Sequence, residues 1–201
     1  VLATQAMAKS VAPLPASCPG VRHWLMLDGT IAGWTGYETA VAAQPAERIA
    51  DELAGGDMLY SSGTTGRPKG VFVPPQATEI DAASPMTDIM VNIYGVSADT
   101  IYLSPAPLYH AAPLRYTLGV HRLGGTVVVM EHFDPLHYLA LVEKHRITHS
   151  QLVPTMFSRM LKLPAEVRNK YDRSTLEIAI HAAAPCPVQV KEQMIEWWGP
   201  I

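Results

Sequence analysis

Residues 126–153 read TVVVMEHFDPLHYLALVEKHRITHSQLV, and this stretch decides the fold class. The run Thr126–Met130 is rich in β-branched residues and predicts a strand. Asp134-Pro135 predicts an N-cap followed by proline in the first helical turn, opening a helix that ends at about His145. Thr148–Val153 predicts the next strand. A strand–helix–strand unit of this kind is typical of parallel strands covered by helices.

The same alternation continues on both sides of this unit. The expected elements are a helix from Ala82 to about Tyr94, a strand at Thr100–Ser104, a helix near Leu114–Arg122, a helix beginning near Pro154, a strand at Leu176–Ile180 and a helix at Pro187–Trp197. We therefore predict an α/β fold in which parallel strands alternate with helices, the doubly wound class.

The amino-terminal part is less regular. Three prolines after Ser10 predict an extended connector, and Val21–Leu27 predicts a strand. Asp57–Tyr60 is interpreted as a short buried strand. We expect two incomplete subdomains, one over residues 1–82 and a second, α/β subdomain over residues 83–201.

Composition excludes several classes of protein. Hydrophobic residues make up 48% of the 201 residues, which excludes a disordered chain. The 15 Lys and Arg against 18 Asp and Glu give a formal charge of −3, so no diffuse basic field favours nucleic acid. Apolar runs such as residues 124–130 are far shorter than the ~20 residues of a membrane-spanning helix. The first ten residues do not have the pattern of a signal peptide, and the two cysteines, Cys18 and Cys186, suit a reducing cytosol, so we expect a cytoplasmic protein.

One decapeptide, SSGTTGRPKG at residues 61–70, has a composition suited to binding phosphate. Glycines let backbone N–H groups bend around an anion, while the hydroxyls and the Lys69 ammonium add donors. It is not the common phosphate loop of nucleotide hydrolases, because Pro68 precedes the lysine and Gly70 follows it where a helix would have to begin. From composition alone, a flexible hairpin loop is the alternative.

The run YSSGTTGRPKGV at residues 60–71 resembles the signature loop of the adenylate-forming, or AMP-binding, superfamily. Its members include acyl-CoA synthetases, aryl-CoA ligases, luciferases and the adenylation domains of peptide synthetases. Two further segments, PLYH at residues 107–110 and HAAAP at residues 181–185, resemble the family's proline–leucine–aromatic–histidine segment and its small-residue turn. The resemblance implies that a carboxylate attacks the α-phosphate of Mg-ATP, releasing pyrophosphate, and that a thiol, usually coenzyme A, then takes the acyl group.

The resemblance also implies roles for particular residues. Lys69 would favour departure of pyrophosphate, and His110 would lie beside the acyl-adenylate. Ala183, Ala184 and Pro185 would form a flat wall against adenine. The β- and γ-phosphates would be held by Ser61, Ser62, Gly63, Thr64, Thr65, Gly66 and Lys69. The implied small molecules are ATP, Mg²⁺, coenzyme A and a carboxylic acid, and no metal ligand is predicted among these residues.

The resemblance further implies an internal fragment of the family's large N-terminal domain. The later segments that bind magnesium and ribose, and the small C-terminal domain, do not occur in these 201 residues, so we expect the fragment alone to be inactive. A fatty acid is the preferred substrate, because no charged residue near His110 or Ala183 is available for an amino-acid ammonium. The alternatives are an aryl-acid ligase, a peptide-synthetase adenylation domain, or a non-catalytic module that binds nucleotide or acyl groups.

Overall fold

The structure is a computed structural model that describes residues 1–61, 66–74, 78–82 and 84–201. The chain divides into two compact units, Val1–Leu53 and Ala54–Ile201. Each unit is described by itself. The subdomain boundary that the sequence predicts after residue 82 stays a prediction.

The first unit is built from short elements around a small parallel sheet. In chain order these are β1 (Leu2–Ala3), η1 (Gln5–Met7), α1 (Ala8–Val11), α2 (Leu14–Ser17), β2 (Leu25–Met26), β3 (Thr35–Gly36) and α3 (Tyr37–Ala42). The strands pair in the order β1-β2-β3. Met26 and Trp34 are buried, and the Trp34 ring meets the edge of Trp24 with 5.1 Å between ring centroids. These aromatic and sulfur-containing side chains supply the core of the unit.

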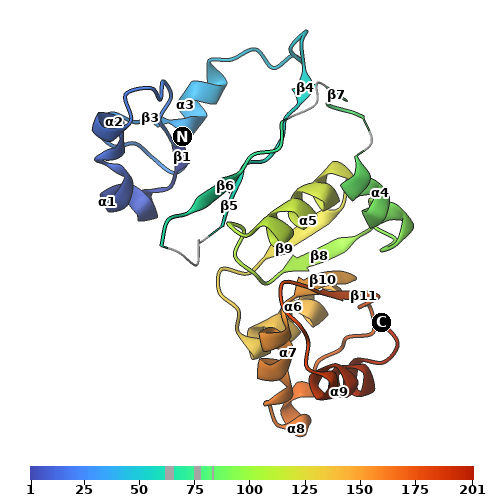
Figure 1. Cartoon of the computed structure of the whole chain (residues 1–201). Coiled ribbons are helices and arrows are strands. Elements are labelled where there is room, and N and C mark those ends of the chain that lie inside the picture. Colours follow the sequence, from blue (N-terminus) through green and yellow to red (C-terminus); the bar gives the residue numbers. More distant parts are fainter. Residues whose placement is uncertain (62–65, 75–77, 83) are drawn as a thin grey trace. The chain divides into compact units, whose positions relative to one another are not determined.

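The second unit is centred on a parallel sheet. Its elements begin with β4 (Leu53–Ala54), whose first residue belongs to the other unit, and continue with β5 (Leu59–Ser61), β6 (Lys69–Val71), β7 (Thr78–Glu79), α4 (Pro85–Asn92), β8 (Ile101–Ser104), α5 (Ala111–Arg122), β9 (Thr126–Val129), α6 (Pro135–His145), β10 (His149–Leu152), α7 (Pro154–Leu161), α8 (Ala165–Arg168), β11 (Ile178–His181) and α9 (Val188–Trp198). Within the described residues, four strands pair in parallel in the order β11-β10-β8-β9 (Figure 1).

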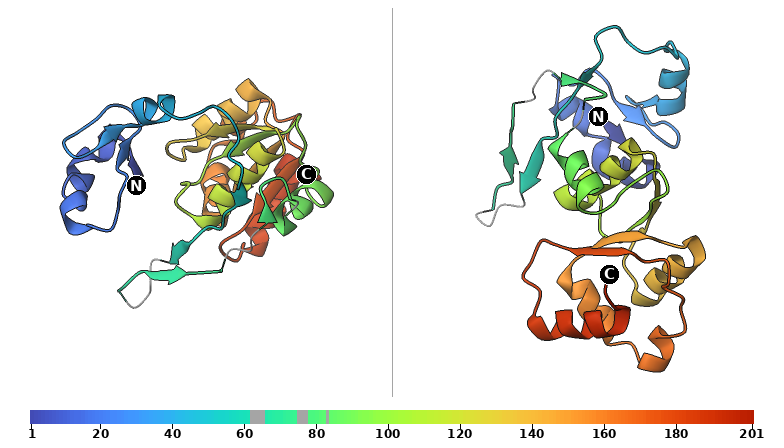
Figure 2. Two further views of the ribbon diagram at one scale, coloured as in Figure 1. Left: turned by 90° about the horizontal axis from the view of Figure 1, so that it is seen from above. Right: turned by 90° about the vertical axis from the view of Figure 1, so that its right-hand side faces the viewer.

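Helices cover both faces of this sheet, with α4 and α5 on one side and α6, α7 and α9 on the other (Figures 1 and 2). Successive strand residues point to opposite faces, so Tyr102 packs beneath α5 while Leu103 joins the core beneath α6 and α7. In the larger core, Tyr138 of α6 stacks on Trp198 of α9 with ring centroids 6.3 Å apart. The fold is therefore α/β with two-sided helical cover, as the sequence predicts.

Local sequence explains where these helices begin and end. The Asp134 carboxylate accepts a hydrogen bond from the His137 backbone N–H at 2.9 Å, capping α6. Ser84 and Thr87 form a reciprocal capping box at the start of α4. Arg146 ends α6 in the left-handed conformation at φ 52°, which turns the chain towards β10.

Two small sheets precede the parallel one along the chain. β5 and β6 form an antiparallel hairpin in which Leu59 pairs with Val71, and Ser61 pairs with Lys69. β4 pairs with β7, a second link between the segments that flank the hairpin. The hairpin is exposed: Tyr60 has 66% of its surface accessible and Phe72 has 65%.

Most elements predicted from residue 85 onward are confirmed within one to three residues, and two predictions before it are wrong. The stretch after Ser10 is not extended, because α1 and α2 are both helical and Pro15 lies in the first turn of α2, where proline is tolerated. The strand near Tyr60 is not buried, because it pairs only with its hairpin partner and no helix covers it among the described residues.

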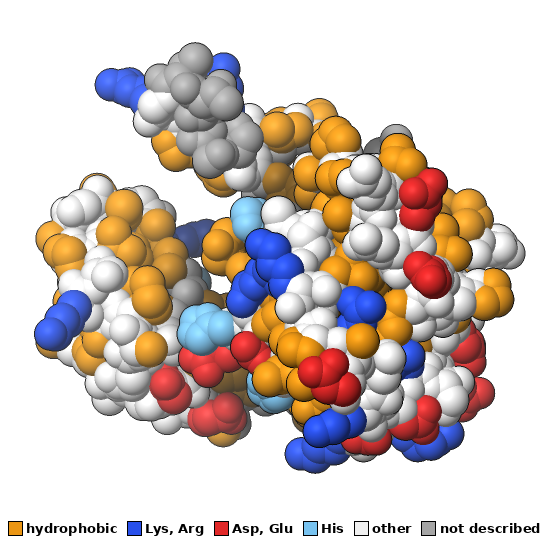
Figure 3. Space-filling model, turned by 90° about the horizontal axis from the view of Figure 1, so that it is seen from below, with side chains coloured by type: hydrophobic (Ala, Val, Ile, Leu, Met, Phe, Trp, Pro, Cys, Tyr) orange, Lys and Arg blue, Asp and Glu red, His pale blue; other side chains and the backbone are white. Residues whose placement is uncertain are grey.

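The surface carries both signs of charge. Figure 3 views the molecule from below, the side on which α8 lies in Figure 1. On the larger unit, acidic and basic side chains there are interspersed with apolar ones. Of the helices in the described part of the chain, none is long and apolar enough to cross a bilayer.

Candidate functional site

The phosphate-binding segment predicted from the sequence grows out of the β5–β6 hairpin. Ser61 and Lys69 are opposite each other at the last paired position, so they form the base of the connecting loop. Gly66, within that loop, has φ 95°, a conformation that side chains other than glycine rarely adopt. At Gly70 a Cβ atom would lie 2.6 Å from the Met58 Cε, so a larger residue there would displace the end of this half-exposed side chain. The remaining predicted loop residues, Ser62, Gly63, Thr64 and Thr65, lie outside the described residues.

The residues at the base of the loop have the chemistry that a polyphosphate needs. Arg67 and Lys69 are exposed cations two positions apart, and neither forms an ion pair with any described residue. A guanidinium and an ammonium beside glycine-rich backbone provide the donors that recognise phosphate oxygens. The donor set therefore fits a nucleotide polyphosphate.

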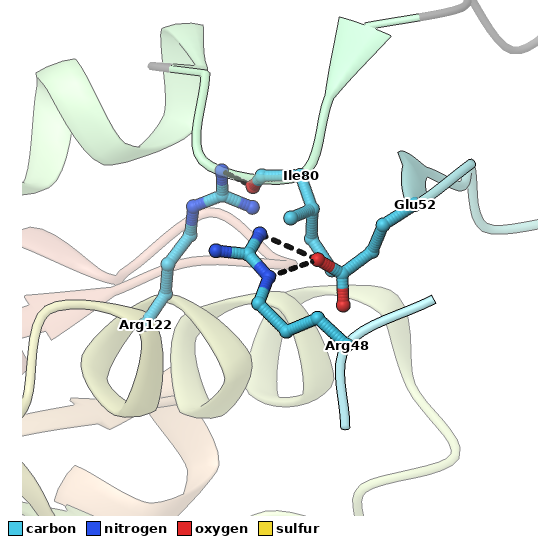
Figure 4. Close-up of polar contacts among 4 residues, drawn as sticks. All are labelled: Arg48, Glu52, Ile80 and Arg122. Carbon is cyan, nitrogen blue, oxygen red and sulfur yellow. Dashed lines mark hydrogen bonds and ion pairs between the residues drawn. The ribbon is translucent and has the colours of Figure 1, made fainter. Parts of the chain in front are cut away.

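Helix α5 anchors the chain on both sides of the hairpin. Its Arg115 guanidinium donates two hydrogen bonds to Asp57, at 2.9 and 3.2 Å, just before β5 begins. Its Arg122 donates to the carbonyl oxygens of Ile80 and Ala82, the latter at 2.7 Å, just after β7 (Figure 4). The Arg115–Asp57 pair is about half exposed, so solvent screening limits its contribution to stability. The Arg115–Asp57 pair mainly fixes position: it holds the base of the hairpin against α5, the helix that His110 caps.

His110 is the N-cap residue of α5 and follows β8 by a short connection. Its backbone N–H donates to the Pro107 carbonyl at 3.2 Å, and its carbonyl accepts from the Leu114 N–H at 3.2 Å. The side chain is exposed, with its ring centroid 4.4 Å from that of Tyr109, which is itself 81% accessible. The imidazole is thus available to a ligand rather than used in the core.

The small-residue turn follows the last described strand of the sheet. Ala183, Ala184 and Pro185 are exposed directly after β11, and Ala183 has φ 71°. A non-glycine residue in this left-handed region is uncommon and indicates a backbone that its surroundings hold in place. Because β8 and β11 are parallel, the turn and His110 lie at the same carboxyl edge of the sheet, the usual ligand-binding edge in open α/β folds.

The predicted site residues fall into two groups. His110 and the turn at Ala183 share the carboxyl edge, while Lys69 lies on the hairpin, whose flanking segments are bonded to α5 within the described residues. Among the described residues no hydrogen bond or ion pair links Lys69 with His110. Nor do three His, Cys, Asp or Glu side chains of the described part gather where they could hold a metal ion.

A buried polar cluster beneath α5 was not foreseen from the sequence. The side-chain oxygens of Tyr116, Thr117 and Gln151 have no hydrogen-bond partner there, and the hydroxyls of Tyr102 and Ser104 have none other than each other. Ser104 and Tyr102 are fully buried, and burial raises the pKa of the Tyr116 hydroxyl above its ordinary value. Unpaired polar atoms are costly in a core, so such a cluster is typical of a site that a water or ligand completes. The available signal was the serine at the carboxyl end of the predicted strand at residues 100–104.

Comparison with known families gives a single assignment. The profile of the family described as "AMP-binding enzyme" matches residues 4–201. The chain belongs to this family.

Several curated relatives of this chain are named as CoA ligases. A 3-[(3aS,4S,7aS)-7a-methyl-1,5-dioxo-octahydro-1H-inden-4-yl]propanoyl:CoA ligase of Mycobacterium tuberculosis is 34% identical over 191 residues, covering 89% of this chain and 36% of the relative. A medium/long-chain-fatty-acid–CoA ligase, FadD8, of the same organism is 33% identical over 81% of this chain and 28% of its own length. The 4-coumarate-CoA ligase 1 of Narcissus pseudonarcissus is 32% identical over 68% of this chain and 25% of its own length. The chain thus spans between a quarter and about a third of these relatives.

Solved structures agree on the fold. The amide bond synthetase McbA of Marinactinospora thermotolerans superposes with a TM-score of 0.75 at 24% identity, covering 98% of this chain and 38% of that one. ATP-bound MatB of Rhodopseudomonas palustris superposes with a TM-score of 0.68 at 25% identity, covering 98% and 37%. The chain therefore has the architecture of part of an adenylate-forming enzyme.

Proposed function

We propose that the protein carrying this chain is an ATP-dependent acid–CoA ligase. In the first step a carboxylate oxygen attacks the α-phosphorus of ATP, the bond to the bridging oxygen breaks, and pyrophosphate leaves. In the second step the thiolate of coenzyme A attacks the acyl carbon of the adenylate, forming a thioester and releasing AMP. The observation that carries the proposal is the Ser61–Lys69 pair at the base of a glycine-containing hairpin loop.

The main difficulty of the first step is charge, because an anionic nucleophile must approach a polyanion. Lys69 would neutralise the departing pyrophosphate, and the backbone and hydroxyl groups of residues 61–66 would supply further donors. Magnesium would arrive with the nucleotide and share this neutralisation. The exposed cations at the base of the loop support this role, since no described carboxylate occupies them.

We assign the carboxyl edge of the sheet to the acyl-adenylate. His110, exposed at the start of α5, would lie beside the reacting carboxylate and donate a hydrogen bond to one of its oxygens. Ala183, Ala184 and Pro185 would present a flat surface to adenine, because none of them has a side chain larger than a proline ring. The left-handed backbone at Ala183 supports this role, since strained backbone of this kind concentrates at ligand sites.

Fatty acids are the substrate class that we prefer, and the fatty-acid ligase among the relatives supports it. An aryl acid is the alternative, supported by the coumarate ligase and by the tyrosines beneath α5, where Tyr102 and Tyr116 have ring centroids 4.7 Å apart. A peptide-synthetase adenylation domain is disfavoured because no carboxylate lies in the segments around His110 or Ala183 to hold an ammonium. The cytosolic location inferred from the sequence stays a prediction.

The test is carboxylate-dependent exchange of labelled pyrophosphate into ATP by the whole protein. We expect Lys69→Ala to lower the exchange rate at least about tenfold, which corresponds to roughly 1.4 kcal/mol of lost transition-state stabilisation. Lys162→Ala, which removes an exposed lysine beyond α7, is the matched control and should leave exchange unchanged. Screening acids of different length and aromaticity in the same assay then separates fatty from aryl substrates.

The outcomes also separate the enzyme from a non-catalytic module. A binding module would retain nucleotide but show no exchange with any acid. Exchange that is equally fast in Lys69→Ala and Lys162→Ala would overturn the role of Lys69. The 201-residue chain alone should bind phosphate weakly and show no exchange, since it spans about a third of its relatives.

A further inference from the structure

A second group of cations lies at the opposite edge of the parallel sheet from His110. Arg168 ends α8, and Arg173 lies in the segment that leads into the amino end of β11. Both approach Trp197 near the end of α9: the Cζ atoms of Arg168 and Arg173 lie 4.9 and 5.0 Å from the centroid of its ring. Two guanidinium groups therefore share one indole.

These two arginines have no carboxylate partner among the described residues. Arg168 donates one hydrogen bond, to the Leu161 carbonyl at 3.1 Å, and its Nε atom is buried without a partner. Arg173 donates three hydrogen bonds, to the carbonyls of Arg168 at 3.4 Å, Tyr171 at 3.1 Å and Trp197 at 3.4 Å. Because each guanidinium has five N–H donors, these bonds leave four donors of Arg168 and two of Arg173 without a protein partner among the described residues.

The positive charge of the pair is only partly compensated. Burial lowers the pKa of Arg173 below its ordinary value; the charge of Asp172 opposes this, and the charge of Arg168 adds to it. The Asp172 carboxylate itself is engaged by Ser174, at 2.8 and 3.1 Å. Like charges that are partly buried and face one another are stabilised by an anion placed between them.

A cleft opens at this point. It has a volume of about 600 Å³ and is lined by Arg168, Asn169, Arg173, Gln193, Glu196 and Trp197, with Leu161 as the apolar contact. The amides of Asn169 and Gln193 add neutral donors, although the Asn169 carbonyl oxygen already accepts from the Trp197 indole at 2.8 Å. Glu196 contributes the negative group that lines the cleft, and its carboxylate would repel an anion.

We propose that this cleft is a binding site for a phosphate group, either inorganic phosphate or a phosphomonoester, separate from the nucleotide site. The planar forks of Arg168 and Arg173 would each bind two phosphate oxygens, which is the geometry that arginine provides and lysine does not. The site lies at the amino edge of the sheet, whereas His110 and Ala183 lie at the carboxyl edge. It does not depend on the ligase activity proposed above.

The test is titration of the 201-residue chain with inorganic phosphate at low salt, followed by tryptophan fluorescence. A parallel titration with AMP tests the phosphomonoester form, and potassium chloride at equal ionic strength is the control. We expect a saturable change with phosphate but not with chloride, and binding weakened about tenfold or more in both Arg168→Gln and Arg173→Gln. Lys162→Gln, which removes a nearby cation outside the lining of the cleft, should bind as the unaltered chain does.

Two further variants keep the result interpretable. Glu196→Gln removes the carboxylate from the cleft and should tighten phosphate binding several-fold, an outcome that misfolding cannot produce. Lys69→Ala should leave this binding unchanged, which separates it from phosphate bound at the hairpin loop. The proposal is overturned if phosphate and chloride behave alike, if the arginine variants bind normally, or if Lys69→Ala rather than these variants abolishes binding.

Discussion

The left-handed backbone at Ala183 predicts an unusual response to glycine. An alanine at φ 71° costs roughly 1–2 kcal/mol relative to the right-handed region, and glycine avoids this cost. Glycine also gains about 0.4–1 kcal/mol of conformational freedom in the unfolded chain, which opposes the benefit. We therefore expect Ala183→Gly to raise the free energy of unfolding by about 0.5–1 kcal/mol, an increase in Tm of about 2–4 °C for each kcal/mol.

The neighbouring Ala182 provides the matched control. It lies outside the left-handed region, and its backbone N–H donates to the Leu152 carbonyl at 3.2 Å. Ala182→Gly should therefore lower the free energy of unfolding by about 0.5–1 kcal/mol, because only the unfolded-state term remains. Urea unfolding followed by far-UV circular dichroism measures both. If the two variants lose stability equally, the strain assigned to Ala183 is absent and the argument from backbone conformation fails.

Three other predictions concern the larger unit. Asp134→Ala removes the cap of α6 and should lower the free energy of unfolding by about 1 kcal/mol in the same urea assay. Arg115→Gln releases Asp57 and should speed amide hydrogen exchange in the hairpin up to about fivefold, with less than about 1 kcal/mol lost globally. Hydrogen bonds from the Ser174 backbone N–H and hydroxyl hold the pKa of Asp172 below its ordinary value, so its contribution to stability is present above about pH 4 and is lost as the pH falls further. Asp172→Asn should therefore make stability less sensitive to pH in that acidic range, whereas an unchanged acid profile would contradict the assignment.

The parallel sheet was predictable because its signals are local and agree with one another. The strand expected at Thr126–Met130 is β9, and the N-cap expected at Asp134 is formed. The position of this strand and the start of the following helix were therefore both predicted correctly. The family was predicted from three ordered motifs and the fold class from the alternation of strands and helices; the family profile confirms the first and the superposed structures confirm the second. Short-range chemistry was enough in these segments because each element packs against its sequence neighbours.

The first unit was harder to predict because its elements are very short. Strands of two residues, such as Leu2–Ala3, carry no usable alternation, and Pro15 favours a helix start as readily as an extended segment. The buried polar cluster beneath α5 could not be predicted either, because whether Tyr116 and Ser104 are buried depends on tertiary packing rather than on their spacing in the sequence. The roles of Lys69 and His110 stay predictions that the exchange assay must decide.

The two arginines of α5 have a consequence for how this region can vary. Arg115 binds the chain before the hairpin and Arg122 binds it after β7, so both ends of the intervening segment are held by the same helix, α5. Substitutions, insertions or deletions between these two contacts should change how far the hairpin extends without moving the points at which it is attached to α5. If the proposed roles hold, the distance between the proposed nucleotide-binding hairpin and the proposed acid-binding edge can therefore be altered by mutation while the sheet itself stays unchanged.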